Sequence, residues 1–117
     1  MSGFRELIYW QKARQLVQEV YRISAAFPTT EQYGLSLQLR RAVVSIPSNI
    51  AEGYGRASRA EYVRFLNIAR GSCYEVETQL ILALDLGFLN EEKAMQSFQL
   101  CAEIGKMLNA AIHSLEH

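Results

Sequence analysis

The chain is poor in residues that carry catalytic or redox chemistry. Among its 117 residues are two cysteines, two histidines and one tryptophan. Cys73 and Cys101 lack a paired metal-binding spacing and fall at apolar helical positions, which indicates small core residues of a cytoplasmic protein. A disulfide or a pair of metal ligands is the alternative. We predict no metal and no cofactor.

Long apolar runs are also absent. No run approaches the roughly 18 residues that span a bilayer, so no membrane association is expected. The chain does not open with a charged segment followed by a short apolar one, which argues against secretion. Its length fits one domain, predicted over residues 1–114. The last residues, 115–117, resemble the start of a vector-derived histidine tag and are given no function.

The sequence contains no convincing catalytic constellation, and we predict that the protein is not an enzyme. Apart from His117, the only histidine is His113, and no Glu-x-x-His pair could bind a di-iron centre. Glu75 and Glu77 are two positions apart on a helix and so point to different sides. The Gly53–Gly55 segment suits the end of a helix better than a phosphate-binding loop.

The chain has no net charge, but its charges are unevenly distributed. Twelve basic and twelve acidic residues cancel overall. Residues 36–74 carry six arginines against two glutamates, a net charge of plus four, whereas residues 75–117 carry two lysines against seven acids. This division predicts a dipolar surface, which suits self-association at least as well as nucleic-acid binding.

Apolar spacing predicts two helices in the first half of the chain. The first runs from Phe4 to Ala26 and is stopped by the Phe27-Pro28 pair. The second is capped by Thr29 or Thr30, with Gln32 at the capping-box spacing from Thr29. It should bend at Pro47 and end where Gly53 and Gly55 adopt left-handed conformations.

Two more helices are predicted in the second half. Ser58 and Glu61 form a capping box that opens the third helix, which closes at Gly87. Asn90, followed by Glu91, caps the fourth. Four long helices with short connections predict an all-α fold, an antiparallel up-down-up-down four-helix bundle.

Charged residues of the second and third helices predict a structural clasp. If these helices fold back around Ser58, residues whose numbers sum to 116 face each other. Arg41 then faces Glu75, and Glu52 faces Arg64. Gly71 would allow the helices to pack closely. The alternative is that the four charges are solvated or have other partners.

Other arginines of the same region form a candidate nucleic-acid contact. The candidate residues are Arg40, Tyr54, Arg56, Arg59 and Arg70, of which Tyr54 could stack on a base. A solvated basic face is the alternative interpretation, and we favour it on the sequence alone.

A second apolar stripe on the third helix predicts contact with another subunit. Val63, Tyr74, Ile81 and Phe88 lie together, away from the stripe expected in the core. The alternative is a broader core that neighbouring helices reach.

Two blocks of the sequence, Arg40–Arg56 and Ala69–Glu75, resemble the signature of 23S rRNA-intervening sequence proteins. Segments of all four predicted helices resemble that family, so the similarity covers nearly the whole chain. The resemblance implies an antiparallel four-helix bundle without established enzymatic activity.

A relative of that family is the accessory protein of diversity-generating retroelements, a ring of five bundles that binds nucleic acid and a reverse transcriptase through a basic surface. The resemblance therefore implies a cyclic homo-oligomer, with a pentamer as the expected ring. The zero net charge of this chain departs from that relative. Two functions follow as alternatives: an accessory protein that binds RNA or DNA, or an oligomeric scaffold that binds a protein partner.

Overall fold

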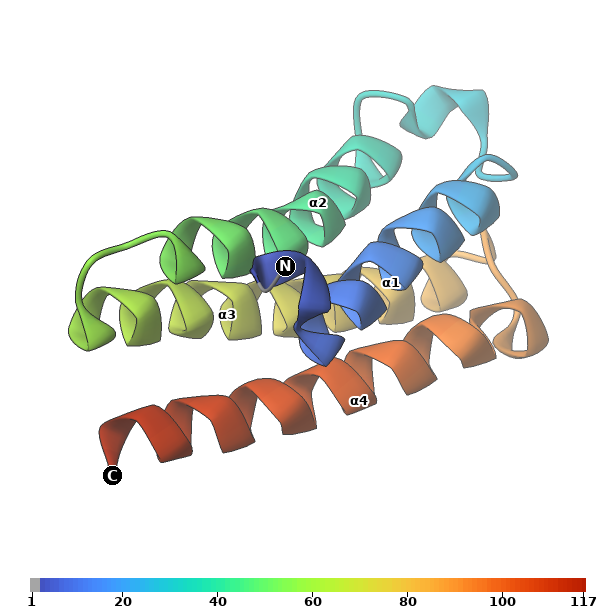
Figure 1. Ribbon diagram of the computed structural model, residues 1–117. Helices are drawn as coiled ribbons and strands as arrows, with labels where there is room; N and C mark the ends of the chain where they lie inside the picture. Colours follow the sequence, from blue (N-terminus) through green and yellow to red (C-terminus); the bar gives the residue numbers. More distant parts are fainter. Residues whose placement is uncertain (1–2) are drawn as a thin grey trace.

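The computed structural model describes residues 3–117, which form four α-helices and two short 3-10 helices and contain no strand. The elements are η1 (Phe4–Glu6), α1 (Ile8–Ser24), η2 (Thr29–Glu31), α2 (Leu35–Tyr54), α3 (Arg59–Asp85) and α4 (Glu91–Glu116). Each helix packs against its neighbours in sequence, and α1 closes the bundle against α4 (Figure 1). The predicted four-helix bundle is confirmed.

The core is built from one apolar face of each helix. Since burying a large aliphatic side chain contributes roughly 1.5–3 kcal/mol, these faces supply most of the driving force for folding. The large side chains with no exposed surface are Leu16, Val20, Leu39, Val43, Ile46, Ile50, Leu66, Val76, Leu80, Ile104 and Leu108.

The predicted boundaries of α3 and α4 are confirmed. The Ser58 hydroxyl accepts a hydrogen bond from the Glu61 backbone N–H at 3.1 Å, which caps α3. The Asn90 side chain caps α4 by accepting from the Lys93 N–H at 2.8 Å. Gly87 follows α3 with φ of +77°, a conformation that favours glycine.

The start of α2 differs from the prediction. The helix begins at Leu35, and Thr29 does not cap it. Instead, the Glu31 carboxylate accepts a hydrogen bond from the Leu35 N–H at 3.0 Å. Gly34 precedes the helix with non-helical backbone angles, so the η2 turn stays separate from α2.

The glycines at the end of α2 also behave differently from the prediction. Gly53 lies inside the helix, and Gly55 has φ of −80°, so neither adopts a left-handed conformation. A Cβ at Gly53 would lie 2.6 Å from the Phe65 Cβ, whereas a Cβ at Gly71 would meet nothing within 4 Å. Gly53, and not Gly71, is therefore the glycine that lets α2 and α3 approach closely.

The first helix is shorter and begins later than predicted. Leu7 has an extended backbone that separates η1 from α1, so the helix does not run continuously from Phe4. With 17 residues against 27 in α3 and 26 in α4, α1 covers only part of the bundle. The N-terminal segment consequently lies near the middle of the bundle's length (Figure 1).

Two further observations concern the ends and the length of the helices. Helix α4 includes Leu115, which packs against the core, so the assignment of residues 115–117 to a tag stays a prediction. Pro47 lies inside α2, which continues past it, and the bend there likewise stays a prediction.

Within residues 3–117, no helix combines the length and apolarity needed to cross a bilayer.

Candidate interaction surfaces

A polar seam joins α2 to α3. The hydroxyls of Ser45 and Ser72 are 2.7 Å apart, so facing residues sum to 117, one more than predicted. The Asn49 side-chain amide donates to the Ser45 carbonyl and hydroxyl at 2.8 and 3.0 Å. Ser72 is buried, and this hydrogen bond satisfies its hydroxyl, as is usual for a buried polar group.

The predicted clasp of opposite charges does not form. Arg64 pairs with Glu61 at 2.9 Å, and Arg56 pairs with Glu52 at 3.2 Å. Residues three or four positions apart on one helix are immediate neighbours, which explains why these local pairs replace the predicted pair of Glu52 with Arg64.

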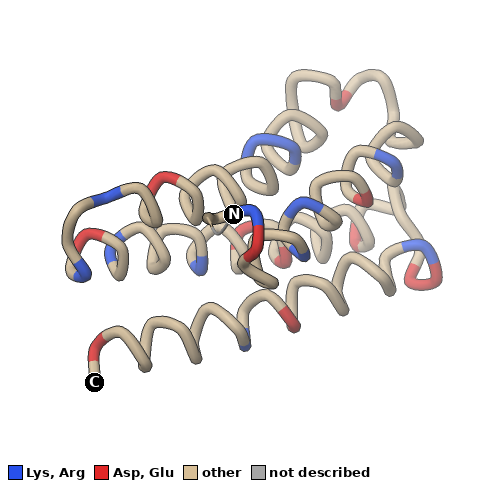
Figure 2. The backbone as a smooth tube through the Cα atoms, in the orientation of Figure 1, with Lys and Arg blue, Asp and Glu red and all other residues tan. Residues whose placement is uncertain are grey.

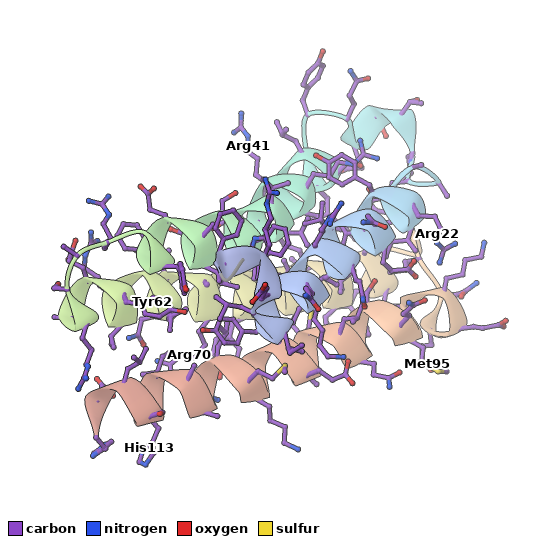
Figure 3. The ribbon with its side chains drawn as sticks, viewed as in Figure 1. Arg22, Arg41, Tyr62, Arg70, Met95 and His113 are labelled. Atoms are coloured by element: carbon purple, nitrogen blue, oxygen red, sulfur yellow. The ribbon has the colours of Figure 1, made fainter. Side chains whose placement is uncertain are left out.

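The other predicted clasp pair is also missing. No ion pair joins Arg41 to Glu75 anywhere in residues 3–117. Both side chains are exposed, and Figure 3 shows Arg41 pointing away from the helices. Exposed charges gain little from pairing, since surface ion pairs contribute about 0–1 kcal/mol.

The candidate nucleic-acid residues do not form one cluster. Arg40 turns towards α1, where it donates to the Ser24 hydroxyl at 2.8 Å and lies over the Tyr21 ring. Arg70 lies between α3 and α4 and donates to Asn67 and Asn109 (Figure 3).

The remaining three candidates lie around the α2–α3 hairpin. Arg56 is paired with Glu52 and also lies over the Phe65 ring, whereas Arg59 is exposed and makes no ion pair within residues 3–117. Tyr54 is 41% exposed. Acidic residues lie among the basic ones around this hairpin, so it is not a uniformly basic surface (Figure 2).

Next to the hairpin, three tyrosines form a cluster. The hydroxyls of Tyr9 and Tyr62 are 2.5 Å apart, and the Tyr54 ring meets the Tyr62 ring edge-on. Burial raises the pKa of Tyr62 well above its ordinary value, and the hydrogen bond with Tyr9 adds to the shift. The hydrogen bond between Tyr9 and Tyr62 therefore holds α1 against α3, and the Tyr62 hydroxyl stays protonated at neutral pH.

The predicted subunit-contact stripe divides into two parts. Val63 and Phe88 are half-buried against the chain's own core, and the Phe88 ring lies 6.0 Å from the Phe27 ring. Tyr74 and Ile81, by contrast, are 60% and 47% exposed. The broader-core alternative therefore describes Val63 and Phe88.

The outward side of α3 carries two more apolar residues that the sequence analysis missed. Ile68 and Leu82 are 41% and 44% exposed. Together with Tyr74, Ile81 and the exposed Gly71 they form what we call the α3 outer face. The helical period places these residues away from the core stripe, so a full wheel of α3 would have found them.

The two cysteines line a groove of about 210 Å³ between α3 and α4, but the thiols themselves are buried. Burial raises the pKa of Cys73 to about 12 and that of Cys101 higher still. Across residues 3–117, no three His, Cys, Asp or Glu side chains are grouped as a metal site.

Comparison with known proteins places the chain in a family. The sequence pattern of 23S rRNA-intervening sequence proteins matches residues 5–110. The chain belongs to this family. This match confirms the resemblance to 23S rRNA-intervening sequence proteins that the segments Arg40–Arg56 and Ala69–Glu75 indicated.

A solved structure shares the fold of this 23S rRNA-intervening sequence protein. It is a protein of unknown function from the S23 ribosomal protein family of Bacteroides thetaiotaomicron, 27% identical, with a TM-score of 0.81. The similarity covers 90% of this chain and 98% of the other. None of the curated proteins compared with the chain matches it.

Proposed function

We propose that this 23S rRNA-intervening sequence protein is a non-catalytic assembly protein whose copies associate through the α3 outer face. The observation that carries the proposal is the exposure of four large apolar side chains on one helix, between 41% and 60% each. Large apolar side chains exposed on one side of a helix mark interaction sites in soluble proteins. A cyclic homo-oligomer, with a pentamer as the expected ring, is the form of assembly that we propose.

Covering this face would contribute to the free energy of association. Fully burying a large apolar side chain contributes roughly 1.5–3 kcal/mol, so covering the half-exposed ones should contribute about 1 kcal/mol each. Four such side chains would supply about 4 kcal/mol per copy before the entropic cost of association. The exposed Gly71 would allow a second copy to approach the α3 backbone closely.

Light scattering after size exclusion at micromolar concentration tests the proposal. We expect the wild type to have a multiple of the 13.3 kDa chain mass. The double variant Tyr74→Ser, Ile81→Ser should shift towards the monomer. A matched control is Tyr33→Ser, Met95→Ser, which removes two apolar side chains that are more exposed than Tyr74 and Ile81 and lie outside α3. A monomeric wild type, or equal dissociation of both double variants, would contradict the proposal.

Nucleic-acid binding at the α2–α3 hairpin is the second candidate function. Arg59 supports it, because this exposed cation makes no ion pair within the described residues and shares the hairpin with the exposed Tyr54. An electrophoretic shift with structured RNA at two salt concentrations tests it, since phosphate contacts give a steep salt dependence.

The Arg59→Glu variant should weaken that shift. The Lys93→Glu variant, which makes an equal change of charge at the opposite end of the bundle, should not. Absence of any shift with the wild type would leave the scaffold alternative, in which the assembled bundles bind a protein partner.

A further inference from the structure

The corner between η1 and α1 contains the chain's only tryptophan, held in a fixed position. The Phe4 ring meets the Trp10 ring edge-on, with their centroids 5.2 Å apart. The Gln11 side-chain amide donates to the Arg5 carbonyl at 2.9 Å, which ties η1 to the first turn of α1. Trp10 is half-buried, so part of its ring remains accessible.

A surface depression of about 600 Å³ opens at this corner. It is lined by Phe4, Arg5, Trp10, Gln11 and Arg14, which include two cations and no acid. The Arg14 guanidinium lies 5.8 Å from the centre of the Trp10 ring. Glu6 is exposed next to Arg5 but does not line the depression.

The two arginines at this corner are available to a ligand. Neither Arg5 nor Arg14 forms an ion pair within residues 3–117, and neither guanidinium donates a hydrogen bond there. At the α2–α3 hairpin, by contrast, Arg56 and Arg64 already pair with glutamates. The strongest combination of free positive charge and accessible aromatic ring therefore lies at Trp10.

We propose that this corner binds a nucleotide unit, with the base on the Trp10 ring and the phosphate between Arg5 and Arg14. A phosphate alone would leave the ring unused, and an uncharged aromatic molecule would leave both guanidinium groups without an acceptor. Arginine pairs well with phosphate oxygens, and aromatic side chains stack on bases of any sequence. The site is independent of self-association and of the hairpin.

Trp10 is itself the reporter for the test, because no other tryptophan contributes to the fluorescence. We expect saturable quenching by adenosine monophosphate and by a uridine decanucleotide, weaker at high salt, and no saturable quenching by inorganic phosphate. Quenching by both nucleotide probes would indicate a site open to free nucleotides. Quenching by the decanucleotide alone would indicate that the same site takes a strand.

Variants of the exposed arginines complete the test. Arg5→Gln, Arg14→Gln should weaken nucleotide binding by about tenfold or more, because two charge-assisted contacts to phosphate are lost. The control Lys93→Gln, Lys106→Gln changes the net charge equally and should leave the quenching curve unchanged, as should Arg59→Glu. Circular dichroism checks that each variant is folded.

Three results would overturn the proposal. One is the absence of quenching by either nucleotide probe at millimolar concentration. Another is a quenching curve that the Arg5 and Arg14 substitutions do not change. The third is equal quenching by poly-glutamate, which would show that the corner binds any anion and does not recognise a base.

Discussion

Replacing Gly53 by alanine should destabilise the bundle, although alanine normally favours a helix. The new Cβ would lie 2.6 Å from the Phe65 Cβ, 3.2 Å from a Tyr62 ring carbon and 3.3 Å from the Tyr62 carbonyl oxygen. A Cβ atom is fixed to its backbone, so Phe65 cannot move aside by changing rotamer. Helices α2 and α3, which share the most extensive contact of any helix pair in the bundle, would have to separate.

The magnitude follows from two opposing effects. Alanine gains about 1 kcal/mol over glycine within a helix. Overpacking a well-packed site costs about 1–3 kcal/mol, and a contact this short between backbone-fixed atoms belongs at the upper end of that range. We therefore expect a net loss of about 1–2 kcal/mol, or a fall in Tm of roughly 4–8 °C.

Urea unfolding followed by circular dichroism measures this change, and Gly71→Ala is the matched control. A Cβ at Gly71 would meet nothing within 4 Å, so the same substitution there should raise the free energy of unfolding by about 1 kcal/mol. The reasoning is refuted if Gly53→Ala is as stabilising as Gly71→Ala, because α2 and α3 would then not be in close contact at Gly53.

Three further predictions concern single side chains. Ser72→Ala should lower the free energy of unfolding by about 1 kcal/mol in urea titrations, because it removes the buried hydrogen bond to Ser45. If Ser72→Thr, which keeps the hydroxyl, lowers the free energy of unfolding by more than Ser72→Ala, then packing at this site matters more than the hydrogen bond. Asn90→Ala should cost about 1 kcal/mol by removing the cap of α4, and Asn90→Asp should not. Burial raises the pKa of Cys73 to about 12, and also raises that of Cys101, above the unfolded value of about 8.5. Stability should therefore be unaffected below pH ~8.5 and should fall as the pH rises towards 12, and iodoacetamide should react with the folded protein much more slowly than with the unfolded one. Equal alkylation rates in both states would show that the thiols are accessible.

Local signals in the sequence predicted the elements that depend on local physics. The caps at Ser58 and Asn90 use hydrogen bonds to residues three positions away, so their pattern is visible in the sequence. Gly87 was predicted as the end of the third helix. That prediction is confirmed, because the left-handed conformation that ends a helix favours glycine and depends only on the local backbone. The four-helix fold followed from the same periodicities.

Tertiary contacts decided the features that were predicted wrongly. Gly53 and Gly71 look alike in sequence, and only the position of Phe65 distinguishes a contact glycine from an exposed one. The clasp pairing assumed that charges across two helices meet, but Arg64 has a nearer partner in Glu61. The register was nonetheless within one residue, because Ser58 fixes the turn between α2 and α3.

The candidate surfaces were only partly predictable, since exposure depends on how far the neighbouring helices reach. Tyr74 and Ile81 were identified as outward-facing residues, and they are exposed. Phe88 was predicted on the same stripe, but α3 ends at Asp85, and Phe88 lies beyond it, where its ring packs near that of Phe27. The Trp10 corner was missed because the break at Leu7, which brings Phe4 against Trp10, has no clear signal in the sequence.

Gly71 connects the stability of the chain with its assembly. A glycine in the middle of a helix is unfavourable by about 1 kcal/mol, and nothing within the chain approaches it closely enough to require one. It lies on the α3 outer face among exposed apolar side chains, where a second copy would need close access to the backbone. If that face is the contact, Gly71→Ala should stabilise each chain and yet weaken association, because the added methyl group holds the second copy away. Contacts within one chain cannot produce that pair of opposite effects.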